Sequence, residues 1–403
     1  MKFKCEQCGS TLNSNAVTEG MKVSCPVCGV EIVCHSCEEK PKLIKVSAIG
    51  DTSGAEENLS GVIQDKMASA IGIEKIKGFS LAGLFSEVFS RHTREEVENY
   101  FTVGTSKTTP SILDVDASWP KPWIFTRMML ASLVLYFLFF VGWSVWKNPK
   151  LLPGLMLVGS FAIPISTLVL FVEINVRRNV SLYMVARLVF LGGIFSLLIT
   201  HLLPDITALT SLMFRDWSEF MGASVAGPLE ESAKVLAMVA VASAAKYRYK
   251  LNGLVVGAAV GTGFSAFESA GYAFDVVLMG GSADDMVRII NLRGLLSPFM
   301  HIVWSAIAGC ALWRVINGQK FKWRMLCDER FIRLLLVPVV LHMVWNSPLQ
   351  LPYFGNQVVV GFVGWFVCIS LIQEGLHEIA GEQMEAKRRV VEETTSPLEG
   401  EAK

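Results

Sequence analysis

The chain has 403 residues, of which 52% are hydrophobic and 18% charged, and its mean hydropathy is +0.45. This composition is too apolar for an ordinary soluble protein of the same length, and it indicates a membrane protein. The 36 basic and 36 acidic residues balance to a formal net charge of zero, so the overall charge gives no reason to expect a nucleic acid as a partner.

Cysteine dominates the first 40 residues. Six of the nine cysteines form three C-x-x-C pairs there, namely Cys5/Cys8, Cys25/Cys28 and Cys34/Cys37. The first two pairs are each followed by glycine, which permits a tight turn that brings both thiolates to one metal. Their spacing suits two hairpins, and four thiolates complete a tetrahedral zinc site with no open position. Residues 1–40 are therefore predicted to be a zinc ribbon whose structural zinc is held by Cys5, Cys8, Cys25 and Cys28, with the third pair as a spare.

Residues 41–120 combine a polar linker with apolar residues at helical spacing, and we expect a few short helices without an assigned function there. No apolar core of the kind found in secretory signal peptides precedes them, because the first long apolar run begins near Trp123. We therefore expect this soluble region to stay in the cytosol.

The rest of the chain predicts an all-α polytopic membrane protein with about eight transmembrane helices. Each apolar run is close to the roughly 20 residues that cross a bilayer as a helix. The runs lie near 128–146, 152–172, 182–203, 221–245, 252–279, 294–313, 331–350 and 356–374. The membrane domain is accordingly placed at 121–377, and the polar residues 378–403 are predicted to form a disordered C-terminal tail.

Positive charge falls in alternate connections between the predicted spans, as expected for loops on the cytoplasmic side. The cations concerned are Arg177, Arg178, Lys246, Arg248, Lys250, Arg314, Lys320, Lys322, Arg324, Arg330, Arg333, Lys387, Arg388 and Arg389. Lys147 and Lys150 in the first connection are the exception. We expect a protein of the cell (inner) membrane with both its N- and C-termini in the cytoplasm.

Four predicted spans carry ionisable or amide side chains, which are costly at bilayer depth and therefore point to function. They contain the motifs Glu230-Glu231-x-x-Lys234, Phe267-Glu268-x-x-x-Tyr272, His301-x-x-Trp304-Ser305 and His342-x-x-Trp345-Asn346. Helical spacing gives each polar group a partner on its own helix. At 1.5 Å per residue from the flanking cations, all four motifs reach a similar depth, so one site is predicted.

Such a cluster could hydrolyse a substrate in two ways that the sequence does not separate. Burial raises the pKa of a carboxyl group and makes it a competent base for activating water, while histidine and asparagine side chains stabilise an oxyanion. Alternatively, two carboxylates and two imidazoles could hold a catalytic zinc with an open water position.

The four motifs resemble those of the PrsW family of membrane proteases, and more distantly the type II CAAX prenyl proteases. The resemblance covers about residues 120–375. It implies that Glu230 and Glu231 carry the general base, that Lys234 steadies them, and that Glu268, His301, His342 and Asn346 complete the centre. It also implies a membrane-anchored protein substrate, as in the regulated release of an anti-sigma factor. The CAAX relatives have other residues at Lys234 and Glu268, so their prenylated substrates are not expected here.

Two other functions fit parts of the same pattern. A transporter also places carboxylates and histidines in the membrane, but it should show an internal repeat with paired broken helices. A non-catalytic scaffold or sensor would retain the fold and recruit partners through the zinc ribbon. Structural roles for single residues also exist: Glu230 and Glu231 follow Pro228 and suit the first turn of a helix, and an intramembrane histidine often only links two helices.

Overall fold

The computed structural model describes most of the chain from residue 68 onward and four short strands before it. The described residues are 2–4, 11–13, 22–24, 31–33, 68–74, 76, 79–93, 96, 99, 101–105, 107–202, 225–242, 247–348, 351–352 and 355–395. The chain divides into two compact units, Met1–Asn58 and Leu59–Lys403.

The first unit contains two antiparallel β-hairpins. Its strands are β1 (Lys2–Lys4), β2 (Thr11–Asn13), β3 (Lys22–Ser24) and β4 (Glu31–Val33). Phe3 is paired with Leu12 and Val23 with Ile32. These are the two hairpins expected from the spacing of the cysteine pairs. The predicted zinc ligands Cys5, Cys8, Cys25 and Cys28, and the third pair Cys34/Cys37, lie outside the described residues.

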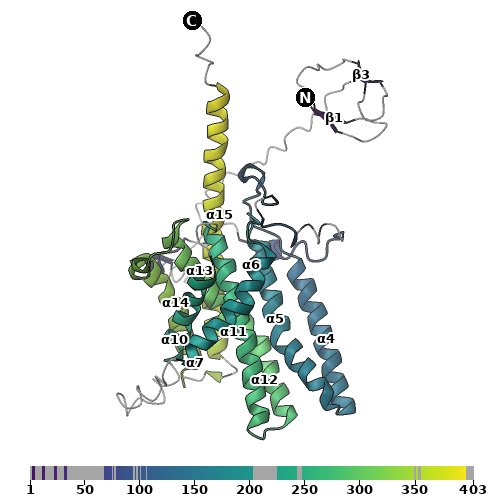
Figure 1. The fold of residues 1–403 in the computed structure, drawn as a ribbon, viewed down its shortest axis with the longest axis vertical. Helices are drawn as coiled ribbons and strands as arrows, with labels where there is room; N and C mark the ends of the chain where they lie inside the picture. The colour runs from purple at the N-terminus through teal and green to yellow at the C-terminus, as the bar shows by residue number, and fades with distance from the viewer. Residues whose placement is uncertain are drawn as a thin grey trace, which may run out of the picture. The chain divides into compact units, whose positions relative to one another are not determined.

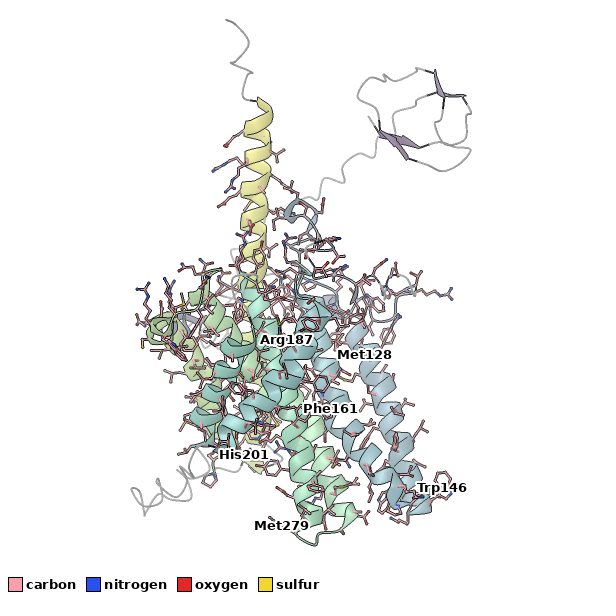
Figure 2. The ribbon with its side chains drawn as sticks, in the orientation of Figure 1. Met128, Trp146, Phe161, Arg187, His201 and Met279 are labelled. Atoms are coloured by element: carbon pink, nitrogen blue, oxygen red, sulfur yellow. The ribbon has the colours of Figure 1, made fainter. Side chains whose placement is uncertain are left out.

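Six helical segments of the second unit are long and apolar enough to cross a membrane, so the protein is a multi-pass membrane protein (Figure 1). They are Ile124–Trp146, Pro149–Ile174, Leu182–Leu202, Lys250–Leu278, Ala283–Ile316 and Gly355–Glu392. Helix α4 (Ile124–Trp146) runs toward the end of the bundle where Trp146 and Met279 lie, and α5 (Leu152–Ile174) returns after the short turn η2 (Pro149–Leu151) (Figure 2).

The sequence predicted about eight spans, and the two outside this set of six are α10 (Ala226–Val241) and α14 (Glu329–Asn346). Helix α10 has only 16 residues, and α14 begins with Glu329, Arg330 and Arg333. Both helices also carry polar motifs, which lower their hydropathy. The described residues therefore show two shorter, more polar helices where complete spans were expected.

Helix α11 (Lys250–Leu278) is the central helix of the second unit and is buried along most of its length. Gly253, Gly257 and Gly261, each four residues apart, lie against α13 (His301–Ile316). A Cβ atom on Gly257 would lie 1.9 Å from the carbonyl oxygen of Ser305. Small residues at this spacing let two helix backbones approach closely in a membrane. The contact fixes α13 against α11.

On another face of α11, the third span changes helical type. It consists of α6 (Leu182–Arg187), the π-helical turn η3 (Leu188–Gly192) and α7 (Gly193–Leu202). Gly263 lies so close to this turn that a Cβ atom on it would be 1.9 Å from the carbonyl oxygen of Val189. The π-helical turn contacts both α10 and α11. Such turns occur frequently at functional sites.

The fifth span is interrupted. Helix α12 (Ala283–Leu296) ends in the 3-10 turn η5 (Ser297–Phe299), and α13 then begins at His301. Pro298 lacks the N–H that a continuous helix needs. The indole Nε1–H of Trp365, on α15 (Gly355–Thr395), donates to the carbonyl oxygen of Pro298 at 3.0 Å. The break therefore has a fixed position and makes His301 the first residue of a helix.

Helix α15 carries a row of glutamates, Glu374, Glu378 and Glu382, that join it to the ends of neighbouring helices. Arg314 and Lys250 pair with Glu374, the backbone N–H of Lys250 donates to Glu378, and Arg248 pairs with Glu382. The helix continues to Thr395, so residues 378–395 are helical where a disordered tail was expected. Ion pairs explain the difference, because they hold a polar helix in place beyond the apolar run.

The segment before the first span packs onto these helix ends and includes the short helices α2 (Leu81–Leu84) and η1 (Ile112–Asp114). The Nε2 amide of Gln383 donates to the carbonyl oxygens of Ile112, Leu113 and Val115. Glu173 accepts hydrogen bonds from the first backbone N–H groups of α4 and is 2% exposed. Because α4 has no side-chain N-cap of its own, Glu173 supplies one from α5.

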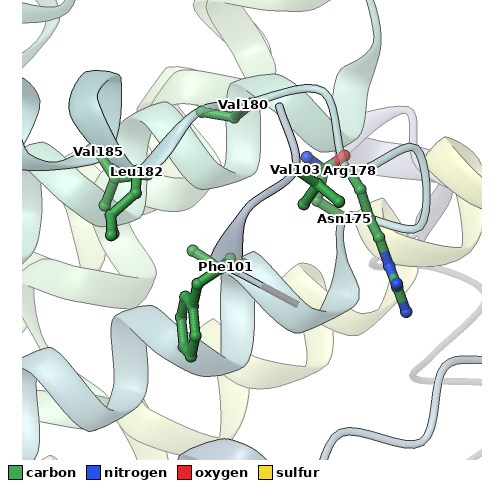
Figure 3. Close-up of a pocket in the computed structure, with 8 residues that line it drawn as sticks. Phe101, Val103, Asn175, Arg178, Val180, Leu182 and Val185 are labelled. Atoms are coloured by element: carbon green, nitrogen blue, oxygen red, sulfur yellow. The ribbon is translucent and has the colours of Figure 1, made fainter. Parts of the chain in front are cut away.

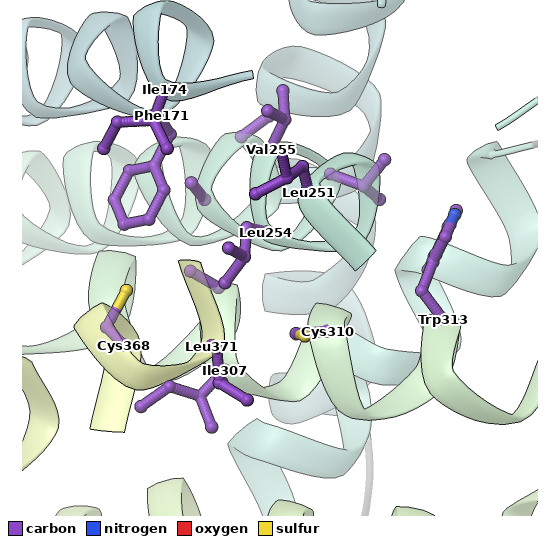
Figure 4. Packing of buried hydrophobic residues seen from close by; sticks show 14 of the residues in the cluster. Phe171, Ile174, Leu251, Leu254, Val255, Ile307, Cys310, Trp313, Cys368 and Leu371 are labelled. Carbon is purple, nitrogen blue, oxygen red and sulfur yellow. The ribbon is translucent and has the colours of Figure 1, made fainter. Parts of the chain in front are cut away.

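Apolar side chains of α5, α11, α13 and α15 fill the main core of the unit (Figure 4).

A small cavity of about 20 Å³ lies where Phe101 and Val103 meet the end of α5 and the start of α6 (Figure 3). The short turn η6 (Trp323–Cys327) joins α13 to α14. None of these features contains a residue of the four polar motifs.

Candidate active site

The four polar motifs meet inside the second unit. Glu230, Glu231 and Lys234 lie near the start of α10, His301 is the first residue of α13, and His342 lies near the end of α14. All five are buried, with Glu231 and Lys234 at 0% exposure. Glu268, on α11, joins them through His301. Residues from all four motifs therefore lie close together in the structure.

Lys234 is the central cation of the cluster. Its Nζ lies 2.7 Å from Oε1 of Glu231 and 3.7 Å from Oε2 of Glu230. It also lies 2.9 Å from Nδ1 of His301 and 4.1 Å from the centre of the Phe264 ring. These contacts come from three helices, because Glu230 and Glu231 share α10 with Lys234 while Phe264 is on α11 and His301 on α13. A buried ammonium group requires this density of partners.

The two histidines are each held by a carboxylate from another helix. Nδ1 of His342 lies 3.0 Å from Oε1 of Glu231, and Nε2 of His301 lies 3.1 Å from Oε2 of Glu268. A carboxylate accepts, so His342 carries its proton on Nδ1 and His301 on Nε2. The ammonium of Lys234 is a donor only, which agrees with an accepting Nδ1 in His301.

Nε2 of His342 and Nδ1 of His301, which also accepts from Lys234, both face Glu230. Nε2 of His342 lies 3.7 Å from Oε2 of Glu230, and Nδ1 of His301 lies 4.0 Å from the same oxygen. Glu230, His301 and His342 each offer one ligand atom, and these atoms lie within 4.8 Å of one another. Oε2 of Glu230 is buried and accepts no hydrogen bond among the described residues. Two imidazoles and a carboxylate are a donor set typical of catalytic zinc.

A polar residue that the sequence analysis missed completes the outer side of the cluster. Arg293 on α12 pairs through Nη2 with Oε2 of Glu268, and its Nε lies 3.2 Å from Oγ of Ser269. Its guanidinium lies over the ring of Tyr272 at 4.3 Å. The signal was weak, because Arg293 directly precedes the predicted apolar run 294–313 and no motif spacing connects it to the other residues.

Aromatic side chains enclose the histidines. The ring of Trp304 lies 4.7 Å from that of His342, and Trp345 packs edge-on against Trp304 at 5.7 Å. Phe264 lies 5.1 Å from His301. Apolar walls exclude water and strengthen the electrostatic contacts among the polar groups. Trp304 and Trp345 therefore form part of the wall around the histidines.

Three expected partnerships within single helices are replaced by contacts between helices. Glu268 pairs with Arg293 and His301, whereas Tyr272 contacts Arg293 and is 50% exposed. Oγ of Ser305 is buried without a hydrogen-bond partner among the described residues. Asn346, the last residue of α14, is half-buried and makes no hydrogen bond to the described part of the cluster. Only the pairing of Lys234 with the two glutamates is local.

The comparison with protein families agrees with this geometry. Residues 181–372 match the model of the PrsW family intramembrane metalloproteases, a range that contains every residue of the cluster and Arg293. Helices α4 and α5 and the N-terminal unit lie outside the matched range. No curated protein and no solved structure gives a significant match to the chain.

Proposed function

This chain belongs to the PrsW family of intramembrane proteases, and from that premise we propose that it hydrolyses a peptide bond of a membrane-anchored protein at the cluster around Glu230, His301 and His342. The observation that carries the proposal is the convergence of these three buried side chains from three helices on one point. Burying ionisable groups in a membrane protein costs free energy, so such groups are found mainly where they serve a functional site.

We propose that Glu230, His301 and His342 hold a divalent metal such as zinc. The donor types suit zinc, and the buried Oε2 of Glu230, which accepts no hydrogen bond among the described residues, leaves room for a ligand. Both imidazoles also have a carboxylate on their other nitrogen, an arrangement common among metal-binding histidines. A bound zinc ion would supply a Lewis acid for the scissile carbonyl and lower the pKa of water.

Glu231 is the residue that we assign to proton transfer. Its Oε1 is held by Lys234 and His342, while its Oε2 is buried without a hydrogen-bond partner among the described residues. In the reaction the water oxygen bonds to the peptide carbon, Oε2 accepts the water proton, and the proton then passes to the departing amide nitrogen. The bond between that nitrogen and the carbon breaks. Lys234 keeps the carboxylate oriented throughout.

Asn346 is assigned to the developing negative charge on the carbonyl oxygen. It lies one turn after His342 on α14, so it shares a helix face with that histidine. Its half-buried amide is a neutral donor of the type found in oxyanion sites. The amide has no other hydrogen bond to the described part of the cluster, which leaves its N–H groups for a substrate.

For the membrane orientation we propose cytoplasmic N- and C-termini in the cell (inner) membrane. Contacts bring cations from two connections to one end of the bundle, since Arg248, Lys250 and Arg314 all reach the glutamates of α15. Such an excess is expected on the cytoplasmic side. We further propose that Cys5, Cys8, Cys25 and Cys28 bind a structural zinc and that the substrate is a single-span regulatory protein, such as an anti-sigma factor.

The experiment is cleavage of tagged single-span substrates in membranes that contain the full chain. We expect wild type to cleave, and Glu230→Gln, Glu231→Gln and His342→Ala to reduce cleavage by at least about a hundredfold. Glu385→Gln and His377→Ala, at exposed positions of α15, are matched controls and should keep wild-type activity. Equal cleavage by all variants, at equal protein levels, would refute the assignment of the cluster.

A further inference from the structure

Arg293 lies outside the group of residues that would touch metal or substrate, yet it is tied to that group by one carboxylate oxygen. Oε2 of Glu268 contacts both Nη2 of Arg293 and Nε2 of His301. We infer that Arg293 is a positioning residue that sets the orientation of His301 through Glu268. This inference rests on the proposed metal site.

The guanidinium of Arg293 is itself fixed from three sides. It pairs with Glu268, donates to Oγ of Ser269, and lies over the face of Tyr272. All three partners are on α11, while Arg293 comes from α12, and its side chain is only 19% exposed. A planar guanidinium held by an ion pair, a hydroxyl and an aromatic face has little rotational freedom. The Glu268 carboxylate is therefore held in one orientation.

That orientation decides which nitrogen of His301 faces Lys234 and Glu230, where a metal at Nδ1 would take the place of the Lys234 hydrogen bond. Glu268 accepts a hydrogen bond from Nε2–H of His301. The opposite ring nitrogen, Nδ1, then points toward Oε2 of Glu230 at 4.0 Å. If the carboxylate rotated away, the ring would lose its only acidic partner at Nε2 among the described residues and could turn. Groups behind a ligand commonly contribute 10- to 100-fold to metal affinity for this reason.

The position of α12 also connects Arg293 to His301. Arg293 precedes the break at Ser297–Phe299, and His301 follows it. The hydrogen bond from Trp365 to Pro298 fixes the break, and the ion pair from Arg293 to Glu268 fixes the helix before it. Both contacts are needed to place the first residue of α13 against α11.

The test compares metal affinity and cleavage in full-length variants. Zinc per chain is measured after dialysis against chelators of graded strength for wild type, Arg293→Gln, Arg293→Lys and the control Arg288→Gln. Arg288 is an exposed arginine on the same helix, so its substitution changes charge equally without touching Glu268. The double variant His301→Ala/His342→Ala defines the zinc that the cysteine pairs hold.

We expect Arg293→Gln to weaken the affinity of the membrane site for zinc by about 10- to 100-fold and to lower kcat more than it raises KM. Arg293→Lys should recover part of the loss, because an ammonium keeps the ion pair but not the contact with Ser269. Arg288→Gln should match wild type. Unchanged zinc affinity and kcat in Arg293→Gln would overturn the inference and leave Arg293 as a tie between helices.

A second comparison holds even if Arg293→Gln folds poorly. If Arg293 acts only through Glu268, then Arg293→Lys/Glu268→Gln should lose no more zinc affinity than Glu268→Gln alone. Additive losses would overturn the inference. The zinc content of wild type distinguishes failure of this inference from failure of the proposed function. If wild type binds no more zinc than His301→Ala/His342→Ala, the proposed metal site itself is absent.

Discussion

Lys234 shows how much a single buried side chain can organise in this protein. It is completely buried and touches a carboxylate, an imidazole and an aromatic face from three helices. In the proposed reaction it orients Glu231, and in the folded protein it also neutralises the buried carboxylates of Glu230 and Glu231. Removing Lys234 should therefore affect both activity and the free energy of unfolding.

We expect Lys234→Met to lower the free energy of unfolding by about 3–5 kcal/mol, because it leaves the Glu231 carboxylate buried without its cation. Adding Glu231→Gln should restore part of this loss, since the uncompensated charge is then gone. Thermal unfolding in detergent measures both effects. Lys147→Met, at an exposed ion pair with Asp284, is the control and should change stability by less than about 1 kcal/mol. A double variant less stable than Lys234→Met would contradict this account.

At the scale of elements, the site depends on how closely α13 approaches α11. Three glycines of α11 form the contact surface, and His301 lies at the end of α13 that this contact positions. Residues on α10 and α14 can meet His301 only if that approach is kept. The geometry of the site is thus a consequence of helix packing that extends from Gly253 to Gly261, which lies against the backbone of His301.

Gly257→Ala tests this dependence. The added methyl group would meet the carbonyl oxygen of Ser305, and separating the helices should cost about 1–3 kcal/mol and strongly reduce cleavage. Gly271→Ala on the same helix is the matched control, because nothing lies within 4 Å of its Cβ position. The control should keep activity and equal or exceed wild type in Tm, since alanine favours a helix. Equal behaviour of the two variants would show that the approach is not required.

Helix α15 holds the segment before the first span through Gln383. Its amide donates to three carbonyl oxygens of residues 112–115, and each hydrogen bond contributes about 0.5–1.5 kcal/mol. Gln383→Ala should therefore loosen this segment and speed trypsin cleavage after the exposed Lys107, as read by gel and mass spectrometry. Glu385→Ala, an exposed neighbour on the same helix, should leave the cleavage rate unchanged. No difference between the two would mean that other contacts hold the segment.

For the molecule as a whole, the division into two units separates the proposed zinc-binding cysteines from the proposed active site. The units are Met1–Asn58 and Leu59–Lys403, and all residues of the cluster belong to the second. A structural zinc in the first unit would then leave the site's own metal unaffected.

Removing residues 1–58 tests this separation. We expect the shortened chain to retain cleavage of a single-span substrate within a fewfold of wild type and to contain one zinc per chain less. Zinc analysis and the cleavage assay on purified protein give both values. If the shortened chain is stable in membranes but inactive, the first unit contributes directly to the reaction or to substrate capture.

The amino-acid sequence by itself determined the membrane class, the α-helical fold and six of the seven residues now placed in or against the cluster, because hydropathy and intramembrane charge are local properties. The sequence predicted about eight spans where six described helices qualify, because the polar motifs lower the hydropathy of α10 and α14. Only the tertiary structure decided which groups pair. Glu268 with Arg293, and Glu231 with His342, join helices whose order in space is set by close glycine packing and by the break at Pro298. Spacing along one helix contains no information on such contacts, so Arg293 was missed and Asn346 remains a prediction.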